Sequence, residues 1–301
     1  MPDPVLVLLD RGAPRLADPS APVLRADDLG VLRGESVFET VRIAGGRPAF
    51  LAAHLRRLQS SADRLEIALP GGWVEVVALA LAHWPDADGI LRLVCSKGPA
   101  AVGPGAVGPG PVGPGAVGPG AVGFGPVGFG LLTPMPAETV AARAGVTAIT
   151  LTLGVPAGLR EGAPWLLGGV KSTSYAANMA SQRRARDVGA DDVVWVSSDG
   201  EVLEAPTSTV AWIAAGRLVT PPPSVGILPG TTLQAVLDLQ LVDADVRRGT
   251  VAELRAAEEV LLLSSGRGIA PVVRLDDVEL GVGPVTQRLQ DAFEATVRHA
   301  G

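Results

Sequence analysis

The residues that organise this chain read GGVKSTSYAAN and occupy positions 168–178. Two glycines and a valine precede Lys171, small and hydroxylated residues follow it, and a helix is predicted over about 179–188. Lysine is rare, since Lys97 is the only other one. A lysine that is withdrawn from water can lose its proton, and a neutral amine can form a Schiff base. Lys171 is therefore a candidate catalytic residue, with an ordinary surface lysine as the alternative.

Composition limits the classes of protein that this chain can represent. With 301 residues, 47% of them hydrophobic, it can bury the core of one large domain or of two ordinary ones. The net charge of −6 argues against nucleic-acid binding, which needs a clustered basic surface. The single cysteine, Cys95, excludes an internal disulfide, and no apolar run reaches the roughly 18 residues that span a bilayer. We expect a cytoplasmic protein without a signal peptide, a membrane partner or a metal site.

Residues 1–136 predict a small α+β domain. Alternating polarity predicts strands, and apolar steps of three and four residues predict helices. The strands fall at about 5–9, 37–43 and 90–95, and the helices at about 50–68 and 72–84. Pro134 and Pro136 mark the expected boundary with a second domain, 137–301.

A glycine- and proline-rich repeat, residues 99–130, interrupts this first domain. The unit AVGPG recurs every five residues and decays to FG at its end. Pro-Gly and Gly-Pro steps favour repeated turns, so we expect neither a helix nor a central strand there. The segment is interpreted as a disordered loop insertion, which costs little stability because loop-closure entropy grows slowly with length.

Residues 137–301 predict a domain that mixes strands and helices. The strands are expected at about 146–153, 193–197, 201–205, 210–213, 217–220 and 259–264, and the helices at about 231–241, 251–257 and 284–299. A loop is expected at 265–268.

Three features of the second domain could serve Lys171. Glu204 ends a predicted hairpin strand, and a carboxylate beside a pyridine nitrogen would keep that nitrogen protonated. Thr231 and Thr232 follow Gly230 at a predicted helix N-terminus, where free backbone N–H groups bind phosphate. Ser265 follows a buried strand and could add a hydroxyl. Each has a simpler alternative, namely a solvated hairpin residue, a helix N-cap and a turn residue.

Taken together, the motifs of this chain resemble those of the class IV (fold-type IV) pyridoxal-phosphate enzymes. That family includes branched-chain and D-amino-acid transaminases and aminodeoxychorismate lyase. The motifs are DLGVLRGESVFET at 28–40, HLRRLQSSA at 54–62, Lys171, ADD at 190–192, DGEVLE at 199–204, TPP at 220–222 and GILPGTT at 226–232.

The resemblance implies a fold, a cofactor and a set of roles. The fold would be a two-domain α/β fold of the α+β type, with the cofactor in the cleft between a small N-terminal α+β domain and a larger C-terminal mixed or pseudo-barrel domain, usually in a homodimer. The cofactor would be pyridoxal 5′-phosphate (PLP). The implied roles are a Schiff base and proton shuttle for Lys171, a contact with the pyridine nitrogen for Glu204, phosphate binding for Arg57, Gly230, Thr231, Thr232 and Ser265, a ring face for Leu228 and a contact with the ring hydroxyl for Tyr175.

The substrate side follows the family pattern less closely. Glu35 and Ser36 replace a commoner Asp-Gly, and Arg33 stands where a tyrosine is frequent. Thr209 replaces a frequent asparagine, so substrate roles transfer less safely than cofactor roles. The substrate candidates are Arg33, Thr40, Arg42 and Thr209.

The motifs also favour one reaction over others. The sequence VFETVR at 37–42 and the residues after Lys171 look more like the lyase branch, because the branched-chain branch usually has Phe-Glu-Gly where Thr40 stands. We therefore expect an aminodeoxychorismate lyase that releases pyruvate and leaves 4-aminobenzoate, a folate precursor. The alternatives are a D-amino-acid or branched-chain transaminase and, as a minority interpretation, an inactive protein that keeps the PLP fold.

Overall fold

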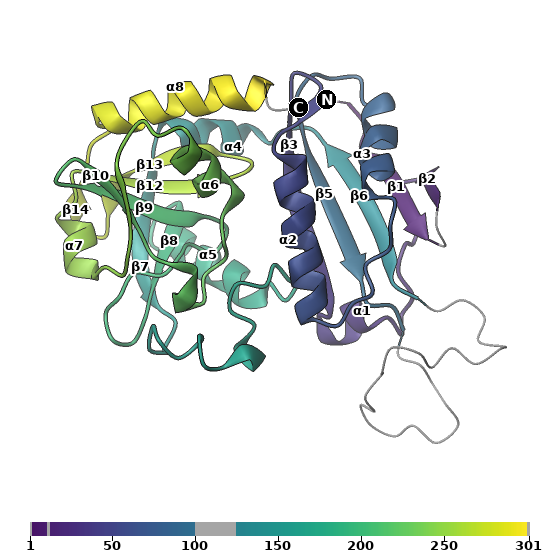
Figure 1. Cartoon of the computed structure of the whole chain (residues 1–301), viewed down its shortest axis with the longest axis horizontal. Helices are drawn as coiled ribbons and strands as arrows, with labels where there is room; N and C mark the ends of the chain where they lie inside the picture. The colour runs from purple at the N-terminus through teal and green to yellow at the C-terminus, as the bar shows by residue number, and fades with distance from the viewer. Residues whose placement is uncertain (1, 11–12, 100–124, 300–301) are drawn as a thin grey trace.

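Two curled sheets stand side by side in the computed structural model, each with its own helices (Figure 1). The structure describes residues 2–10, 13–99 and 125–299. The first sheet is antiparallel throughout. Its strands, in spatial order, are β2 (Ala13–Ala17), β1 (Val5–Asp10), β6 (Val127–Thr133), β5 (Gly89–Ser96), β3 (Ser36–Ala44) and β4 (Arg47–Pro48).

Two helices cover one face of this sheet, α2 (Leu51–Arg64) and α3 (Trp73–Ala82). Leu58 and Ala62 of α2 lie four residues apart and pack on β3 residues such as Val41. Both helices follow the predicted periodicity, and each ends a few residues before its predicted limit. A short helix, α1 (Leu29–Arg33), precedes β3 and was not predicted; the Asp28 side chain caps its N-terminus.

Strand β6 corrects the interpretation of the repeat. Residues 100–124 lie outside the described residues, but Val127–Gly130 form the first half of a strand between β1 and β5. These four residues contain no proline, so every backbone N–H can join the ladder. Their glycines admit α3, because a Cβ on Gly128 would lie 2.9 Å from Trp73 and one on Gly130 would lie 2.7 Å from Val76. The expectation that no central strand arises from 99–130 is therefore wrong at its C-terminal end.

The second sheet mixes parallel and antiparallel pairs. β10–β11, β13–β7 and β7–β8 are parallel, and the remaining pairs are antiparallel. In spatial order the strands are β11 (Ala244–Val246), β10 (Arg217–Thr220), β9 (Thr209–Ala214), β12 (Glu259–Ser264), β13 (Gly268–Leu275), β7 (Val146–Thr152) and β8 (Asp192–Val196), with β14 (Val278–Glu279) on β13.

Helices close the second sheet and position its functional ends. They are α4 (Ala137–Ala141), α5 (Ala176–Asp187), α6 (Thr231–Asp238), α7 (Val251–Arg255) and α8 (Pro284–His299). Phe293 and Leu289 of α8 are buried against β12 and β13. The carboxylate of Glu259 is 4% exposed and accepts hydrogen bonds from the backbone N–H groups of Val285 and Thr286, which fixes the start of α8. No helix among the described residues is long and apolar enough to cross a membrane.

The two halves are joined beyond their covalent link. β6 ends at Thr133 and α4 begins at Ala137, next to the boundary expected after residue 136; that the halves are separate folding units stays a prediction. The Lys171 segment pairs with β3, since Phe38 N–H donates to the Lys171 carbonyl at 3.0 Å and Thr173 N–H donates to the Ser36 carbonyl at 2.9 Å. The Lys171 stretch therefore belongs to both halves.

Candidate active site

A cavity of about 940 Å³ lies between the two halves. Every residue predicted to bind the cofactor lines it, and so do two of the substrate candidates, Thr40 and Thr209. The cofactor candidates brought together are Arg57, Lys171, Tyr175, Glu204, Leu228, Gly230, Thr231, Thr232 and Ser265. Because residues from all parts of the chain converge here, this cavity is the candidate active site. The individual roles stay predictions.

The Lys171 amine is held in an apolar wall of this cavity. Its Nζ lies 4.4 Å from the centroid of the Phe38 ring. Its backbone N–H donates to the Ser61 hydroxyl of α2 at 3.1 Å. Burial lowers the pKa of Lys171 to about 8, against a smaller opposite effect of the Glu39 carboxylate. About a tenth of the amine is therefore neutral at pH 7 and about half at pH 8, and the neutral form is the one that acts as a nucleophile or a base.

Glu204 lines the same cavity as the phosphate-binding candidates. Its backbone carbonyl accepts from Trp195 of β8 at 2.8 Å, and its Oε2 accepts from the Leu228 backbone N–H at 3.1 Å. Burial raises the pKa of Glu204 to about 7, although the Leu228 N–H opposes the shift. A carboxyl group of this kind can exchange or share a proton with a basic ring nitrogen.

Tyr175 stands next to Lys171, immediately before α5. Its ring meets Phe38 edge to face, with the centroids 5.2 Å apart. Burial, followed by the effect of the Glu204 carboxylate, raises the pKa of Tyr175 to about 12. The phenol therefore keeps its proton and can donate a hydrogen bond to an anionic oxygen.

The other end of the cavity is shaped for an anion. Gly230 caps α6 without a side-chain bond, so the first N–H groups of that helix point to the cavity end, beside the buried hydroxyls of Thr231 and Thr232. Glycine avoids a close contact at 230, because a Cβ there would lie 2.3 Å from the Thr209 hydroxyl oxygen and Thr209 would have to shift. Ser265, from the loop after β12, adds a third hydroxyl. We call Thr231, Thr232 and Ser265 the hydroxyl cup.

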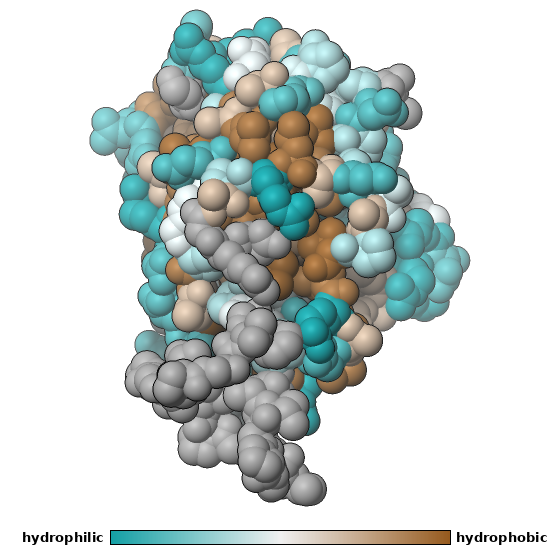
Figure 2. All heavy atoms as spheres, turned by 90° about the vertical axis from the view of Figure 1, so that its right-hand side faces the viewer, coloured by the Kyte–Doolittle hydropathy of each residue, from teal (hydrophilic) through white to brown (hydrophobic). Residues whose placement is uncertain are grey.

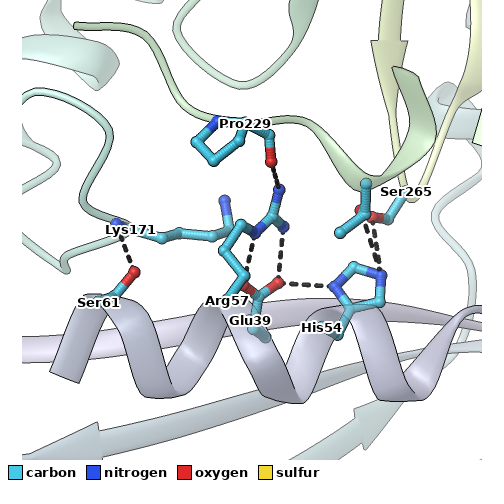
Figure 3. A network of polar contacts seen from close by, with 8 residues as sticks. Glu39, His54, Arg57, Ser61, Lys171, Pro229 and Ser265 are labelled. Atoms are coloured by element: carbon cyan, nitrogen blue, oxygen red, sulfur yellow. Dashed lines mark hydrogen bonds and ion pairs between the residues drawn. The ribbon is translucent and has the colours of Figure 1, made fainter. Parts of the chain in front are cut away.

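A buried carboxylate that the sequence did not single out organises the helix beneath this cup (Figure 3). Glu39 accepts two hydrogen bonds of 2.7 Å from Arg57, whose third nitrogen donates to the Pro229 carbonyl at 2.8 Å. His54 Nδ1 lies 2.7 Å from the same carboxylate. Burial alone would raise the pKa of Glu39, but the bonds from Arg57 and His54 outweigh it and lower the pKa to about 2. The sequence signal that could have identified Glu39 is a glutamate on the inward-facing side of an apolar strand.

Two predicted substrate residues lie elsewhere. Arg33 is exposed at the end of α1 and does not line the cavity. Arg42 extends from β3 to α8, where it forms two hydrogen bonds of 2.6 Å with Glu294. Its charge is therefore committed to a contact between the halves. Arg92, which sequence reasoning missed, lies opposite Thr40 on β5 and does line the cavity.

Comparison with known proteins identifies the family of this chain. The sequence model of the amino-transferase class IV family matches residues 36–275. The chain belongs to the class IV aminotransferase family. A Mycobacterium tuberculosis protein described as a bifunctional aminodeoxychorismate lyase / D-amino acid transaminase is 35% identical, over 94% of this chain and 96% of that one. PLP is the cofactor of the family, so the predictions of a PLP-dependent enzyme and of its cofactor are confirmed.

Solved structures agree with this class IV assignment. A PLP-bound hypothetical aminotransferase from M. tuberculosis superposes with a TM-score of 0.85 at 36% identity, covering 98% of this chain and 99% of that one. A fold IV transaminase from Curtobacterium pusillum gives 0.85 at 34% identity, with coverage of 97% and 99%. The predicted two-domain α/β fold is confirmed.

The class IV residues of this chain fit the cofactor chemically. The hydroxyl cup, the free N–H groups of α6 and Arg57 match an anionic phosphate. The buried Glu204 carboxyl matches a ring nitrogen, and the low-pKa Lys171 matches an aldehyde.

Proposed function

We propose that this protein is an aminodeoxychorismate lyase, which eliminates pyruvate from 4-amino-4-deoxychorismate and leaves 4-aminobenzoate. Two features of the cavity support this proposal, namely its volume and the guanidinium of Arg92 in its lining. The cavity volume of about 940 Å³ is near the upper end for small-molecule sites, roughly 300–1,000 Å³. Arg92 lines this space and forms no ion pair within the described part of the chain. A guanidinium there suits a ring-shaped substrate that carries carboxylates.

The residues around the cavity have distinct tasks in this reaction. When bound, PLP draws electrons from the carbon that carries the substrate's amino group. The Lys171 amine accepts the proton of that carbon, while Glu204 stabilises the protonated ring nitrogen. The carbon–oxygen bond to the enolpyruvyl group then breaks, the substrate ring becomes aromatic, and Lys171 delivers the proton to the departing group as pyruvate forms. The hydroxyl cup and Arg57 hold the phosphate throughout.

A D-amino-acid transaminase is the second candidate. It is favoured by the M. tuberculosis relative, whose description carries both activities, and by a D-alanine aminotransferase of Bacillus licheniformis that is 26% identical over 94% of this chain. In a transamination, Lys171 would return the proton to the cofactor's aldehyde carbon instead of to a leaving group. The same residues therefore serve both reactions, and the residues that contact the substrate decide which reaction occurs.

The test is incubation of the PLP-loaded enzyme with aminodeoxychorismate and no amino acceptor. The lyase releases pyruvate and 4-aminobenzoate in equal amounts, and Lys171→Ala abolishes both. A parallel reaction with D-alanine and 2-oxoglutarate tests the transaminase. Turnover of D-alanine without any 4-aminobenzoate from aminodeoxychorismate would overturn the proposed lyase.

Replacement of Arg92 tests directly whether this residue contacts the substrate. Arg92→Gln should raise the KM for aminodeoxychorismate by about tenfold or more, because a charge-assisted contact with a carboxylate is lost. The cofactor absorbance should not change, since no predicted cofactor contact is altered. Arg33→Gln is the matched control, as Arg33 is exposed outside the cavity. An unchanged KM in Arg92→Gln would remove Arg92 from the substrate site.

We also propose that the enzyme is a homodimer. Apolar side chains gather on the face of the N-terminal half shown in Figure 2, on the side where β2 and α3 lie. Leu16 of β2 is 43% exposed and Val74 of α3 is 58% exposed. Contiguous apolar surface of this kind is typical of association sites. Light scattering should give twice the 30.6 kDa of one chain, and a mass of 30.6 kDa would contradict the proposal.

A further inference from the structure

His54 occupies a place in α2 that the reaction described above does not use. His54, Arg57 and Ser61 lie three and four residues apart, so they share one face of the helix, and this face points at the active site (Figure 3). Arg57 and Ser61 contact Glu39 and Lys171, respectively. His54 is 1% exposed, although it carries two ring nitrogens that must find polar partners.

Both nitrogens of His54 have partners, one on each side. Nδ1 lies 2.7 Å from Glu39, whose pKa of about 2 keeps the carboxylate without a proton. The hydrogen in this contact therefore belongs to Nδ1. Nε2 then faces the hydroxyl cup, 3.5 Å from the Thr231 hydroxyl oxygen and 3.5 Å from that of Ser265.

We propose that the Glu39–His54 pair is a positioning unit for the cofactor's phosphate, which aims the Thr231 and Ser265 hydroxyl hydrogens into the cavity. A hydroxyl has one hydrogen to donate and two lone pairs. When Nε2 carries a proton, both hydroxyl oxygens face that donor, and their own hydrogens are left for the phosphate. His54 thus acts from behind the hydroxyl cup without touching the cofactor.

The charge arrangement explains why one carboxylate serves two side chains. Glu39 also holds Arg57, so a single buried anion fixes a guanidinium and an imidazole at the same end of the cavity. Both partners come from the N-terminal half, while Thr231 and Ser265 come from the C-terminal half. The inference concerns only cofactor binding and holds for either reaction proposed above.

The test compares PLP with pyridoxal, which lacks the phosphate. His54→Asn keeps a nitrogen for Glu39 but is too short to reach the hydroxyl cup, whereas His54→Gln can place an amide nitrogen near the Nε2 position. His54→Asn should weaken PLP binding by about tenfold or more, as groups that orient ligands from behind typically do. Its affinity for pyridoxal should not change, and His54→Gln should recover part of the loss. His83→Asn is the control, because His83 is exposed and its Nδ1 lies 3.0 Å from the Leu79 carbonyl, away from the cavity residues.

A structural role alone predicts a different pattern. Equal losses for PLP and pyridoxal in His54→Asn, or no loss at all, would overturn the proposal. If the variants do not fold, nitrogen NMR of the wild-type protein decides, since the chain has only three histidines to assign. The proposal requires a protonated Nε2 on His54 in the PLP-loaded protein, and an unprotonated Nε2 there would refute it.

Discussion

At the scale of single residues, two side chains that line the cavity have shifted proton affinities. Lys171 binds its proton less tightly than usual and Glu204 binds its proton more tightly, in both cases because burial disfavours charge. Such pairs are typical of active sites that exchange protons near neutral pH.

The pKa of Lys171 can be measured directly. With only two lysines in the chain, reductive methylation with carbon-13 gives few signals, and Lys171→Arg identifies the relevant one. In the cofactor-free protein that signal should titrate near 8. Because folding weakens proton binding by this amine, the unfolded chain binds more protons between about pH 8 and 10.5, and this amine makes the fold more stable as the pH rises through that window. Titration near the ordinary value of 10.5 would contradict the buried environment.

Replacement of Glu39 should be costly. Glu39→Gln leaves Arg57 and His54 without their buried anion, and we expect a loss of about 3 kcal/mol in the free energy of unfolding. The pKa of Glu39 is lowered, so its contribution is complete above the ordinary value of 4.5 and disappears as the pH falls towards 2. Urea denaturation of the apoprotein measures it. Glu35→Gln is the control, because the Glu35–Lys97 pair is partly exposed and should contribute less than about 1 kcal/mol. Equal losses of stability in Glu39→Gln and Glu35→Gln would refute the view that the buried Glu39 carboxylate stabilises Arg57 and His54.

Sequence reasoning selected cavity residues whose neighbours in the chain suggest their environment, and it missed residues whose partners are distant in the sequence. Lys171 and the threonines at 231 and 232 could be predicted because their neighbours in the chain already suggest their environment. Arg42 could not, since its partner Glu294 is 252 residues away and turns a candidate substrate contact into a structural one. Glu39 was also missed, because its two partners, His54 and Arg57, are on another element.

At the scale of elements, regular periodicity predicted well and irregular strands did not. The helix expected over 284–299 is α8, with the same limits. Strand β13 was missed, because Pro271 and a register shift between Val272 and Arg274 interrupt the usual pattern. The first half of β6 was missed, since residues 127–130 resemble the preceding repeat.

Replacement of a β6 glycine by alanine should reduce stability more than replacement of a glycine in the preceding loop. Gly128→Ala places a methyl group 2.9 Å from the Trp73 ring, so α3 must shift, and we expect a loss of about 1–3 kcal/mol in stability. Gly125→Ala meets nothing within 4 Å and should have little effect. Thermal or urea denaturation of both variants measures the difference. If Gly128→Ala were as stable as Gly125→Ala, the close approach of α3 to β6 would be wrong.

At the scale of the whole molecule, several polar contacts join the two halves. Arg42 on β3 and Glu294 on α8 form one of them, with side-chain exposures of 6% and 27%. Glu294→Ala should cost about 2 kcal/mol, because it leaves a buried guanidinium unpaired. Asp277→Ala is the control, since Asp277 is 82% exposed in its pair with Arg255 and such pairs contribute little. Equal unfolding midpoints for the two variants would show that the Arg42–Glu294 contact does not stabilise the molecule.

The overall architecture was predictable from the sequence, because both halves have clear strand and helix patterns and their change falls near residue 136. The way the halves face each other was not, since it depends on side chains that meet only after both sheets have formed.

The short ladder between residues 171–173 and β3 has a consequence for anyone who cuts this polypeptide in two. A fragment ending near 136 would keep α2 and β3, and the complementary fragment would carry the lysine. Mixing them would restore the amine's chemistry only after the second piece had docked along the first, since Phe38, Ser36 and Ser61 hold its backbone. Recovery of the reactive amine would therefore be a direct assay of reassembly.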